Sequence, residues 1–249
     1  MKIIQVSDLH LVAPGTTLFG SDPLARLEDC IVYLNRHHAD ADLVVFTGDL
    51  TNDGEPAAYA ALAARLPALR APYRLMLGNH DDRAAFIRAF PHGLAADGFA
   101  HSSFDLAGGR LVMLDTLEPG QVAGRLCAAR LGWLDRALEG AADAFVFLHH
   151  PPAQIGVPSL DDSRLADAEG LLRVLRRHGN VRHLFAGHVH RLVTGSWGGI
   201  PFSTLRSTNH QSALNLAGPF GVSFEPPAYA VILANGGDII VHTHEFPHR

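Results

Sequence analysis

Along the first two thirds of the chain, short apolar runs alternate with segments of helical periodicity. Apolar runs of four or five residues between polar residues are typical of buried strands. Leucine and isoleucine at helical spacing within 24–35 predict a helix, with Pro23 suited to its first turn and Asp22 to its N-cap. The pattern as a whole predicts strands over 2–6, 43–47, 73–77, 111–114, 145–148 and 183–186, and helices over 24–35, 55–66, 83–90, 126–138 and 166–177.

The pattern changes toward the C-terminus. Strands are predicted over 192–197, 200–204, 229–234 and 239–244, with the turns Gly198-Gly199 and Gly236-Gly237 between them. From the residues alone we expect one α/β domain whose sheet continues into a mostly antiparallel second sheet. Segment 209–227 is rich in Gly, Pro and Ser and has no clear period. Long loops of this kind in compact domains are often functional.

Composition narrows the class of protein. A chain of 249 residues with 47% hydrophobic and 18% charged residues can bury a core, which excludes bulk disorder. Two cysteines, Cys30 and Cys127, cannot form a disulfide framework, so we expect a reduced, cytoplasmic compartment. The net charge of −5 argues against a stable nucleic-acid partner. The sequence lacks an apolar run of about 18 residues, so we expect no membrane association.

The unusual feature is the presence of 16 histidines, several of which follow predicted strands. In open α/β sheets, ligands bind outside the carboxyl ends of the strands, so residues that follow different strands can converge on one site. Crowded carboxylates and imidazoles are costly without a cation between them. The residues at predicted strand ends are Asp8 and His10, Gly48-Asp49, Gly78-Asn79-His80-Asp81, His149-His150-Pro151, and Gly187-His188-Val189-His190.

The residue types indicate which metals are suitable. Carboxylate, amide and imidazole donors fit divalent ions such as Mn, Fe, Co or Zn. The set contains no thiolate, which argues against a closed structural zinc site. The ions would also give the site a local positive field that attracts a phosphate ester, although the chain as a whole is acidic.

This series of motifs resembles the calcineurin-like metallophosphoesterase superfamily over residues 1 to about 195. The stretch from Gly48 to Gly54, with Tyr59 shortly after, is similar to the bacterial class III cyclic-nucleotide phosphodiesterases and the related glycerophosphodiesterases. The polar stretch 207–211 is a looser match to the same branch. The resemblance implies a four-layer α/β/β/α sandwich with two facing mixed β-sheets.

The resemblance also implies roles for individual residues. It implies two divalent ions per chain, bridged by Asp49. His80 would hydrogen-bond the phosphoryl group or protonate the leaving alkoxide, and Asp81 would orient His80. Asn52 could face the cleft or cap the next helix, and His210 could contact substrate or cap its loop. One ion would be held by Asp8, His10, Asp49 and His190, and the other by Asp49, Asn79, His149 and His188.

The implied function is a metal-dependent phosphodiesterase acting on small phosphodiesters, with 3′,5′-cyclic nucleotides such as cAMP as the leading class. Hydroxide held by the ion pair would attack phosphorus in line with the leaving oxygen. The alternative enzyme is a glycerophosphodiester or phosphonate monoester hydrolase. The alternative from a different class is a non-catalytic binding scaffold of the same fold. Against it, a suitable residue stands at every metal-ligand position of the family pattern. Leu77 stands where protein Ser/Thr phosphatases have Arg, which argues against that branch.

By analogy with the branch, we expect a homo-oligomer built from a single domain over 1–249, with a cap or oligomerisation segment around 206–228. The remaining histidines give weaker signals. We expect His150 to turn away from the site and hydrogen-bond nearby backbone, while His101 carries no assignment. An additional metal site at His242 and His244 is disfavoured. Surface positions are expected for His37, His38, His92, His178 and His248.

Overall fold

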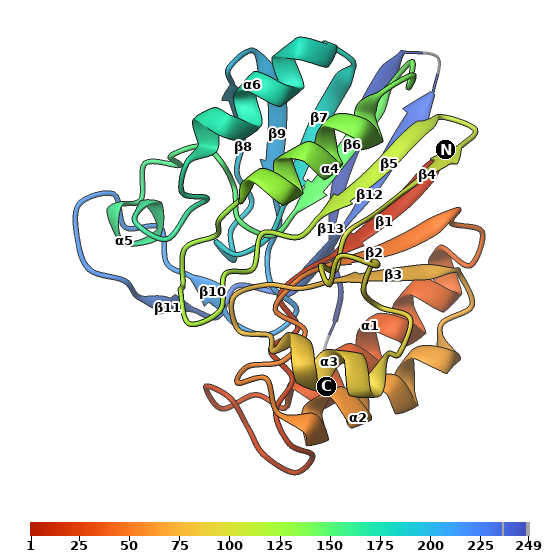
Figure 1. Cartoon of the computed structure of the whole chain (residues 1–249). Helices are drawn as coiled ribbons and strands as arrows, with labels where there is room; N and C mark the ends of the chain where they lie inside the picture. The colour runs from red at the N-terminus through yellow and green to blue at the C-terminus, as the bar shows by residue number, and fades with distance from the viewer. Residues whose placement is uncertain (236, 248–249) are drawn as a thin grey trace.

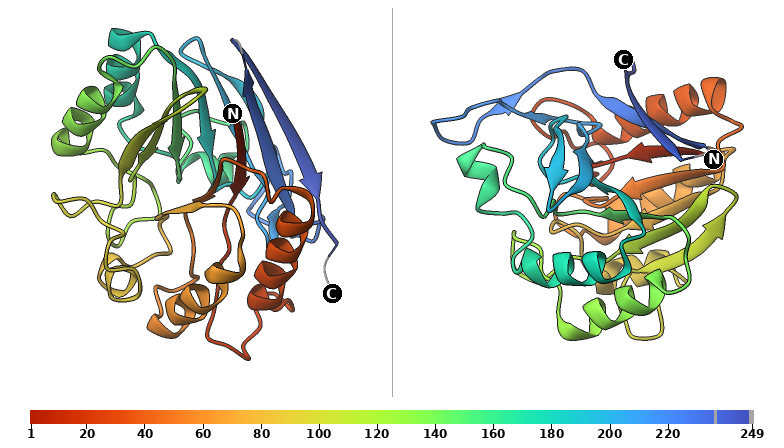
Figure 2. Two further views of the ribbon diagram at one scale, coloured as in Figure 1. Left: turned by 90° about the vertical axis from the view of Figure 1, so that its right-hand side faces the viewer. Right: turned by 90° about the horizontal axis from the view of Figure 1, so that it is seen from above.

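The computed structural model describes residues 1–235 and 237–247, so Gly236 of the expected turn and His248 lie outside the described residues. Two β-sheets face each other, and helices cover the outer face of each (Figure 1). Helices α1, α2 and α3 lie on one side of the sheets and helices α4 and α6 on the other, as the two further views also show (Figure 2). The expected four-layer α/β/β/α sandwich is confirmed.

The first sheet has five strands in the order β13-β12-β1-β2-β3. Strands β1, β2 and β3 run parallel, whereas β12 pairs antiparallel with both β1 and β13. The sheet is therefore mixed, and its three parallel strands end at the same edge. Its strands are β1 (Lys2–Val6), β2 (Leu43–Thr47), β3 (Tyr73–Met76), β12 (Ala228–Asn235) and β13 (Asp238–Glu245).

The second sheet has six strands in the order β4-β5-β6-β7-β9-β8. Strands β5, β6, β7 and β9 are parallel, and the two edge strands are antiparallel to their neighbours. This sheet is mixed as well. Its strands are β4 (Ser102–Leu106), β5 (Gly109–Leu114), β6 (Ala144–Leu148), β7 (Val181–Ala186), β8 (Thr194–Trp197) and β9 (Ile200–Thr204).

The helices begin close to where the sequence predicts them. Pro23 opens the first helix, and the Asp22 carboxylate accepts hydrogen bonds from Leu24 N at 2.9 Å and Ala25 N at 3.2 Å, as an N-cap should. The helices are α1 (Pro23–His37), α2 (Pro56–Arg65), α3 (Arg83–Ala89), α4 (Ala128–Leu138), α5 (Pro158–Asp161) and α6 (Ala168–His178), with a 3₁₀ turn at Leu66–Ala68.

The three largest apolar clusters of the described residues form layers, one between the sheets and one beneath each group of helices. Between the sheets, the rings of Phe147 and Phe185 stack with centroids 4.9 Å apart. Under the helices, Leu27 of α1 packs in the first cluster and Leu171 of α6 in the second. Because strands β2 and β6 are buried on both faces, they read as continuous apolar runs rather than as alternating patterns.

The expectation that the sheet continues into a mostly antiparallel second sheet is wrong. Strands β12 and β13 join the first sheet beside β1, while β8 and β9 extend the second sheet beyond β7. Strand β4 was not predicted, because it is an edge strand whose Ser and Asp residues dilute its alternation. A strand pattern gives the elements but not which existing edge each strand joins.

The segment that follows the second sheet begins with the buried residues 207–212, and its later part projects from the body of the molecule as an arm (Figure 1). It is mostly loop, as expected, but it contains the short antiparallel pair β10 (Gln211–Ser212) and β11 (Val222–Ser223). Leu214, Leu216 and Phe224 on this arm are 63%, 63% and 71% exposed. Among the described helices, none is long and apolar enough to cross a bilayer.

Candidate metal centre

The five polar motifs follow strands β1, β2, β3, β6 and β7, and the fold brings them to one edge of the sandwich. Backbone hydrogen bonds join the motifs within and across the two sheets. Asp8 N donates to Gly48 O at 3.2 Å, and Gly187 N donates to His149 O at 3.0 Å. His188 N donates to the Asp8 carboxylate at 3.0 Å, which ties the last motif to the first. The side chains of these motifs are therefore held on a cross-linked backbone.

The backbone at this edge is unusual. Seven described non-glycine residues have positive φ, and five of them are candidate metal ligands. Such conformations are uncommon for residues with a Cβ and tend to cluster at functional sites. The five ligand positions are Asp8 (φ 56°), His10 (47°), Asp49 (47°), His188 (70°) and His190 (47°).

The first group of donors consists of Asp8, His10, Asp49 and His190, whose ligand atoms all lie within 4.8 Å of one another. All four residues are buried. His10 Nε2 lies 3.6 Å from Asp49 Oδ2, and His190 Nε2 lies 3.4 Å from Asp8 Oδ1. The structure thus brings together the residues that the sequence assigns to the first ion.

The hydrogen bonds of these imidazoles fit a cation between them. His190 Nδ1 donates to His210 O at 2.9 Å, and His10 Nδ1 donates to Asn52 Oδ1 at 3.2 Å. The two Nε2 atoms, left without outward partners, face each other at 2.9 Å. Two unprotonated imidazole nitrogens at this distance repel each other unless a cation lies against both. The donor set of this group therefore suits a divalent metal ion.

The second group lies on the other side of Asp49. His149 Nδ1 donates to Thr47 O at 2.8 Å, while its Nε2 lies 3.2 Å from both Asp49 Oδ2 and Asn79 Oδ1. His188 extends this group, with ring centroids 5.1 Å from His149. Asp49 Oδ2 thus faces both a histidine of the first group and one of the second. This is the position that a bridging ligand requires.

His150 lies beside the second group but is occupied elsewhere. Its Nε2 donates to Val122 O at 3.0 Å, and its Nδ1 accepts from the Thr116 hydroxyl at 2.8 Å. Both ring nitrogens are therefore satisfied by protein groups. The expectation that His150 bonds nearby backbone is confirmed, but the expectation that it turns away is wrong, because its ring lies 4.7 Å from the rings of both His149 and His188, centroid to centroid.

The pKa values at this edge reflect a demand for positive charge. Burial opposes ionisation of Asp8, but His190 and His149 lower its pKa to about 2. Burial likewise opposes protonation of His149, but Asp49 and then Asp8 raise its pKa to about 9. His188 behaves oppositely, since burial and the neighbouring His149 lower its pKa to about 3. Burial also opposes ionisation of Asp49, but His149 and then His10 hold its pKa well below the usual value. Two anionic carboxylates thus draw a proton onto His149, and bound metal cations would supply the same positive charge.

Glycine is required at two close contacts between the motifs. Gly48 has φ +94°, and a Cβ there would collide with the His149 ring. A Cβ at Gly78 would collide with the Asp49 carboxylate. Gly48 thus lets the backbone approach His149, and Gly78 lets it approach the bridging residue Asp49.

His80 and Asn52 lie beside the first group. His80 N donates to Asp49 Oδ1 at 2.9 Å, and His80 Nδ1 donates to Asn52 O at 2.6 Å. Asn52 therefore contacts both His80 and His10. The alternative that Asn52 caps the next helix is wrong, because α2 begins at Pro56 with Glu55 at the N-cap position.

Asp81 is placed differently from the expectation that it orients His80. Its carboxylate accepts hydrogen bonds from Gly78 N at 2.9 Å, Leu50 N at 3.0 Å, Thr51 N at 3.1 Å and the Tyr59 hydroxyl at 2.7 Å. The described hydrogen bonds of Asp81 do not include the His80 ring, so the structure does not bring these two side chains together as expected. Burial and then Asp49 raise the pKa of Asp81 to about 6. The carboxylate instead joins the loops that carry Asp49 and Asn79.

A cavity of about 430 Å³ opens over the two groups of donors. Its lining includes His10, Asp49, Asn79, His188 and His190 together with His80, Asn52 and His210. His210 packs its ring 5.2 Å from His10 and 4.6 Å from His190, centroid to centroid. The volume is in the range of small-molecule sites.

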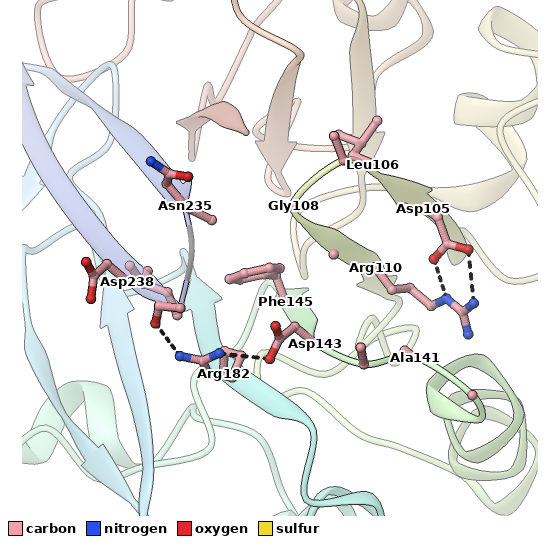
Figure 3. Close-up of a pocket in the computed structure, with 17 residues that line it drawn as sticks. Asp105, Leu106, Gly108, Arg110, Ala141, Asp143, Phe145, Arg182, Asn235 and Asp238 are labelled. Carbon is pink, nitrogen blue, oxygen red and sulfur yellow. Dashed lines mark hydrogen bonds and ion pairs between the residues drawn. The ribbon is translucent and has the colours of Figure 1, made fainter.

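A larger cavity, about 520 Å³, lies away from this edge between the β4–β5 turn and the adjoining ends of β12 and β13 (Figure 3). Its two arginines are already paired: Arg110 with Asp105 at 2.7 Å and Arg182 with Asp143 at 2.8 Å. A phosphate would have to displace these carboxylates. The smaller cavity at the strand ends is therefore the candidate site.

Several neighbours of the site carry no signal in the sequence. Ser163 lies in the loop between α5 and α6, and its hydroxyl is 3.0 Å from His188 Nε2. Phe19 also lines the cavity and packs against His210 at 4.5 Å. Both lie in irregular segments, where periodicity gives no indication of which side chains face the site.

The remaining histidines fall outside the site. His101 is buried and stacks on Trp133 with centroids 3.9 Å apart, which accounts for it structurally. His242 and His244 are in neither of the candidate metal groups found among residues 1–235 and 237–247. Among those expected at the surface, His37 and His92 are exposed.

Comparison with known proteins places the chain in a family. The family model of calcineurin-like phosphoesterases matches residues 1–192. A probable cyclic nucleotide phosphodiesterase of Rhodopseudomonas palustris is 40% identical over 99% of this chain and 93% of its own length. A probable glycerophosphodiester phosphodiesterase of Arcobacter nitrofigilis is 32% identical over 92% of this chain and 86% of its own length.

The fold has solved counterparts as well. A dimetal phosphatase from Danio rerio superposes with a TM-score of 0.69 over 99% of both chains at 17% identity, which supports the fold alone. The family match, the similar relatives and the two groups of metal donors agree with one another. The chain belongs to the calcineurin-like phosphoesterase family, in the branch of cyclic-nucleotide phosphodiesterases and glycerophosphodiesterases, and is a metal-dependent phosphodiester hydrolase.

Proposed function

We propose that this hydrolase cleaves small phosphodiesters and that 3′,5′-cyclic nucleotides such as cAMP are its leading substrate class. The observation that carries the proposal is the position of Asp49 Oδ2 between His10 and His149, in a cavity of about 430 Å³ that also contains His80. The Rhodopseudomonas relative, named as a cyclic nucleotide phosphodiesterase, supports the substrate class.

We assign two divalent ions to the two groups of donors. Carboxylate, amide and imidazole donors fit Mn, Fe, Co or Zn. When bound, such a pair lowers the pKa of water and stabilises charge on phosphoryl oxygens. One ion would be held by Asp8, His10, Asp49 and His190, and the other by Asp49, Asn79, His149 and His188.

The role of the chain's own residues follows from their hydrogen bonds. His80 Nδ1 donates to Asn52 O, so Nε2 is the ring nitrogen left for the substrate. Protonated there, His80 would hydrogen-bond the phosphoryl group or give its proton to the departing alkoxide. Asn52 holds His80 by its backbone and His10 by its side chain, so it positions both. His210, whose ring lines the cavity, is assigned to substrate contact.

The experiment is a substrate panel with each metal. Protein stripped by chelator is expected to be inactive and to recover on binding two ions per chain from Mn, Fe(II), Co or Zn, counted by elemental analysis. cAMP, cGMP and bis(p-nitrophenyl) phosphate are expected to be cleaved, with kcat/KM at least about tenfold above that for p-nitrophenyl phosphate. Glycerophosphoethanolamine and a phosphonate monoester complete the panel. Faster cleavage of monoesters than of every diester would contradict the proposal, as would a folded protein that takes up no metal at saturating Mn.

We further propose that copies of the chain associate through the arm around 206–228 and that the protein works in the cytoplasm. The exposed Leu214, Leu216 and Phe224 support the first, since exposed apolar groups of this size suit an interface. The free thiols of Cys30 and Cys127 support the second. A monomeric mass in light scattering, or recovery outside the cytoplasm on cell fractionation, would contradict them.

A further inference from the structure

Phe19 is held in a conformation that its own turn does not explain. It is at the tip of a tight hairpin in which Leu18 N donates to Ser21 O at 2.8 Å and Ser21 N donates to Leu18 O at 3.0 Å. Phe19 has φ 49° and Gly20 has φ 79°. Such turns favour Asn or Gly at both central positions, and a bulky residue there is rare. Strain of this kind often marks a functional position.

The ring of Phe19 stands at the mouth of the metal cavity. It is 50% exposed, and its inner side packs on His210 at a centroid distance of 4.5 Å. His210 in turn contacts the rings of His10 and His190. Only one imidazole therefore separates Phe19 from the first group of metal donors.

A second aromatic ring reaches the same cavity from the arm. Phe220 lines the cavity and is 52% exposed. Its position is fixed by the β10–β11 pair and by Ala213 N, which donates to Gly221 O at 2.7 Å. Ser212 N bonds His190 O at 3.4 Å, which joins the arm to a metal donor. The described ring contacts do not include one between Phe19 and Phe220, and about half of each side chain is open to solvent.

These rings divide the cavity into two chemical regions. One set of lining residues consists of the Asp49 carboxylate and five histidines, and the other consists of the apolar side chains of Leu18, Phe19, Val122, Leu160 and Phe220. Aromatic side chains stack on nucleobases with useful affinity, and every base offers a π-face. A glycerol ester has no such face and gains nothing from this apolar lining.

We propose that Phe19 and Phe220 form an aromatic rim that binds the planar base of a nucleotide diester while its phosphate lies over the metal donors. The inference rests on the proposed function and makes it more specific: the site takes ring-bearing diesters in preference to glycerol diesters. Phe19 and Phe220 are therefore specificity-determining residues, and the strained backbone at Phe19 presents its ring to the base.

The test compares cAMP with the 3′,5′-cyclic phosphate of methyl ribofuranoside, which has the same phosphate ring but no base. Phe19→Ala and Phe220→Ala are each expected to raise KM for cAMP about tenfold, with little change in kcat and none in kcat/KM for the base-free substrate. Calorimetry provides a readout apart from turnover: each variant should bind 5′-AMP about tenfold more weakly and ribose 5-phosphate as tightly as the parent.

Two further variants separate this role from structural ones. Phe19→Gly relieves the positive φ, so it should keep or raise Tm while weakening 5′-AMP binding; a fall in Tm would indicate a purely structural residue. Phe224→Ala is the matched control, because Phe224 is a 71% exposed aromatic of the same arm that is not among the residues lining the cavity. It should leave both substrates unaffected.

The outcomes distinguish the inference from the function on which it rests. Equal losses of kcat/KM on cAMP and on the base-free substrate would overturn the aromatic rim. An equal loss in Phe224→Ala would overturn it as well, because the effect would then come from association between copies. Unchanged cAMP kinetics and 5′-AMP binding in both Phe variants would overturn it too. A parent protein that cleaves neither cyclic diester but cleaves monoesters would instead overturn the proposed function.

Discussion

An Asp49→Asn variant is expected to lose turnover of diesters by roughly 10³-fold, because a bridging carboxylate contributes several kcal/mol of charge stabilisation to both ions. Oδ2 of Asp49 lies 3.2 Å from His149 Nε2 and 3.6 Å from His10 Nε2, so one neutral amide weakens both groups of donors. Asn is the appropriate replacement, since it keeps the shape and, like Asp, tolerates the φ of 47° at this position. Elemental analysis should find fewer than two ions per chain.

The matched control is Asp40→Asn. Asp40 is an exposed carboxylate paired with Lys2, and its loss should change turnover by less than about twofold. Circular dichroism must show that Asp49→Asn still folds, because its backbone also anchors His10 N at 2.9 Å. A folded Asp49→Asn protein with two ions and parental turnover would contradict the bridging assignment.

The placement of the metal donors could be predicted because two simple signals coincide. Strands β1, β2 and β6 are buried apolar runs whose ends are sharp in the sequence, and parallel strands finish at one edge. Any polar residue directly after such a strand is thus delivered to a common place. The expected donors from Asp8 to His190 indeed meet there, although they are about 180 residues apart in sequence.

The pairing of the C-terminal strands could not be predicted in this way. A strand pattern records which face is buried but not which free edge the strand will join. Strand β12 pairs antiparallel with β1, from Lys2 opposite Leu233 to Gln5 opposite Ala230. That choice depends on contacts across most of the chain, and no local periodicity specifies it.

The hydrogen-bond partners of individual side chains could not be predicted from the sequence either. Asp81 follows His80 directly, which suggested that it orients that ring, yet it bonds to Leu50, Thr51 and Tyr59 instead. The local chain turn points the two side chains to different partners, and a linear spacing cannot show this. Phe19 illustrates the same limit, because its role depends on a left-handed backbone in a loop.

A His80→Ala variant is expected to keep both ions and its fold while kcat for cAMP falls by about 10² to 10³, the usual contribution of a general acid. His80 lies outside both groups of donors, and its Nδ1 is fixed by Asn52 O at 2.6 Å, which leaves Nε2 for the substrate. The ribose alkoxide of cAMP is a poor leaving group that needs a proton. p-Nitrophenolate leaves without one, so bis(p-nitrophenyl) phosphate should lose less than about tenfold.

The ratio of the two losses decides between the two roles open to His80. A loss confined to cAMP assigns it to protonation of the leaving oxygen, whereas equal losses on both substrates assign it to a hydrogen bond to the phosphoryl group, which both esters share. His92→Ala is the control, since His92 is an exposed histidine on the loop after α3, away from the cavity over the metal donors, and should not affect either rate. Parental turnover of cAMP by a metal-loaded His80→Ala protein would exclude both roles, because no general acid and no phosphoryl contact can be removed without cost to a poor leaving group.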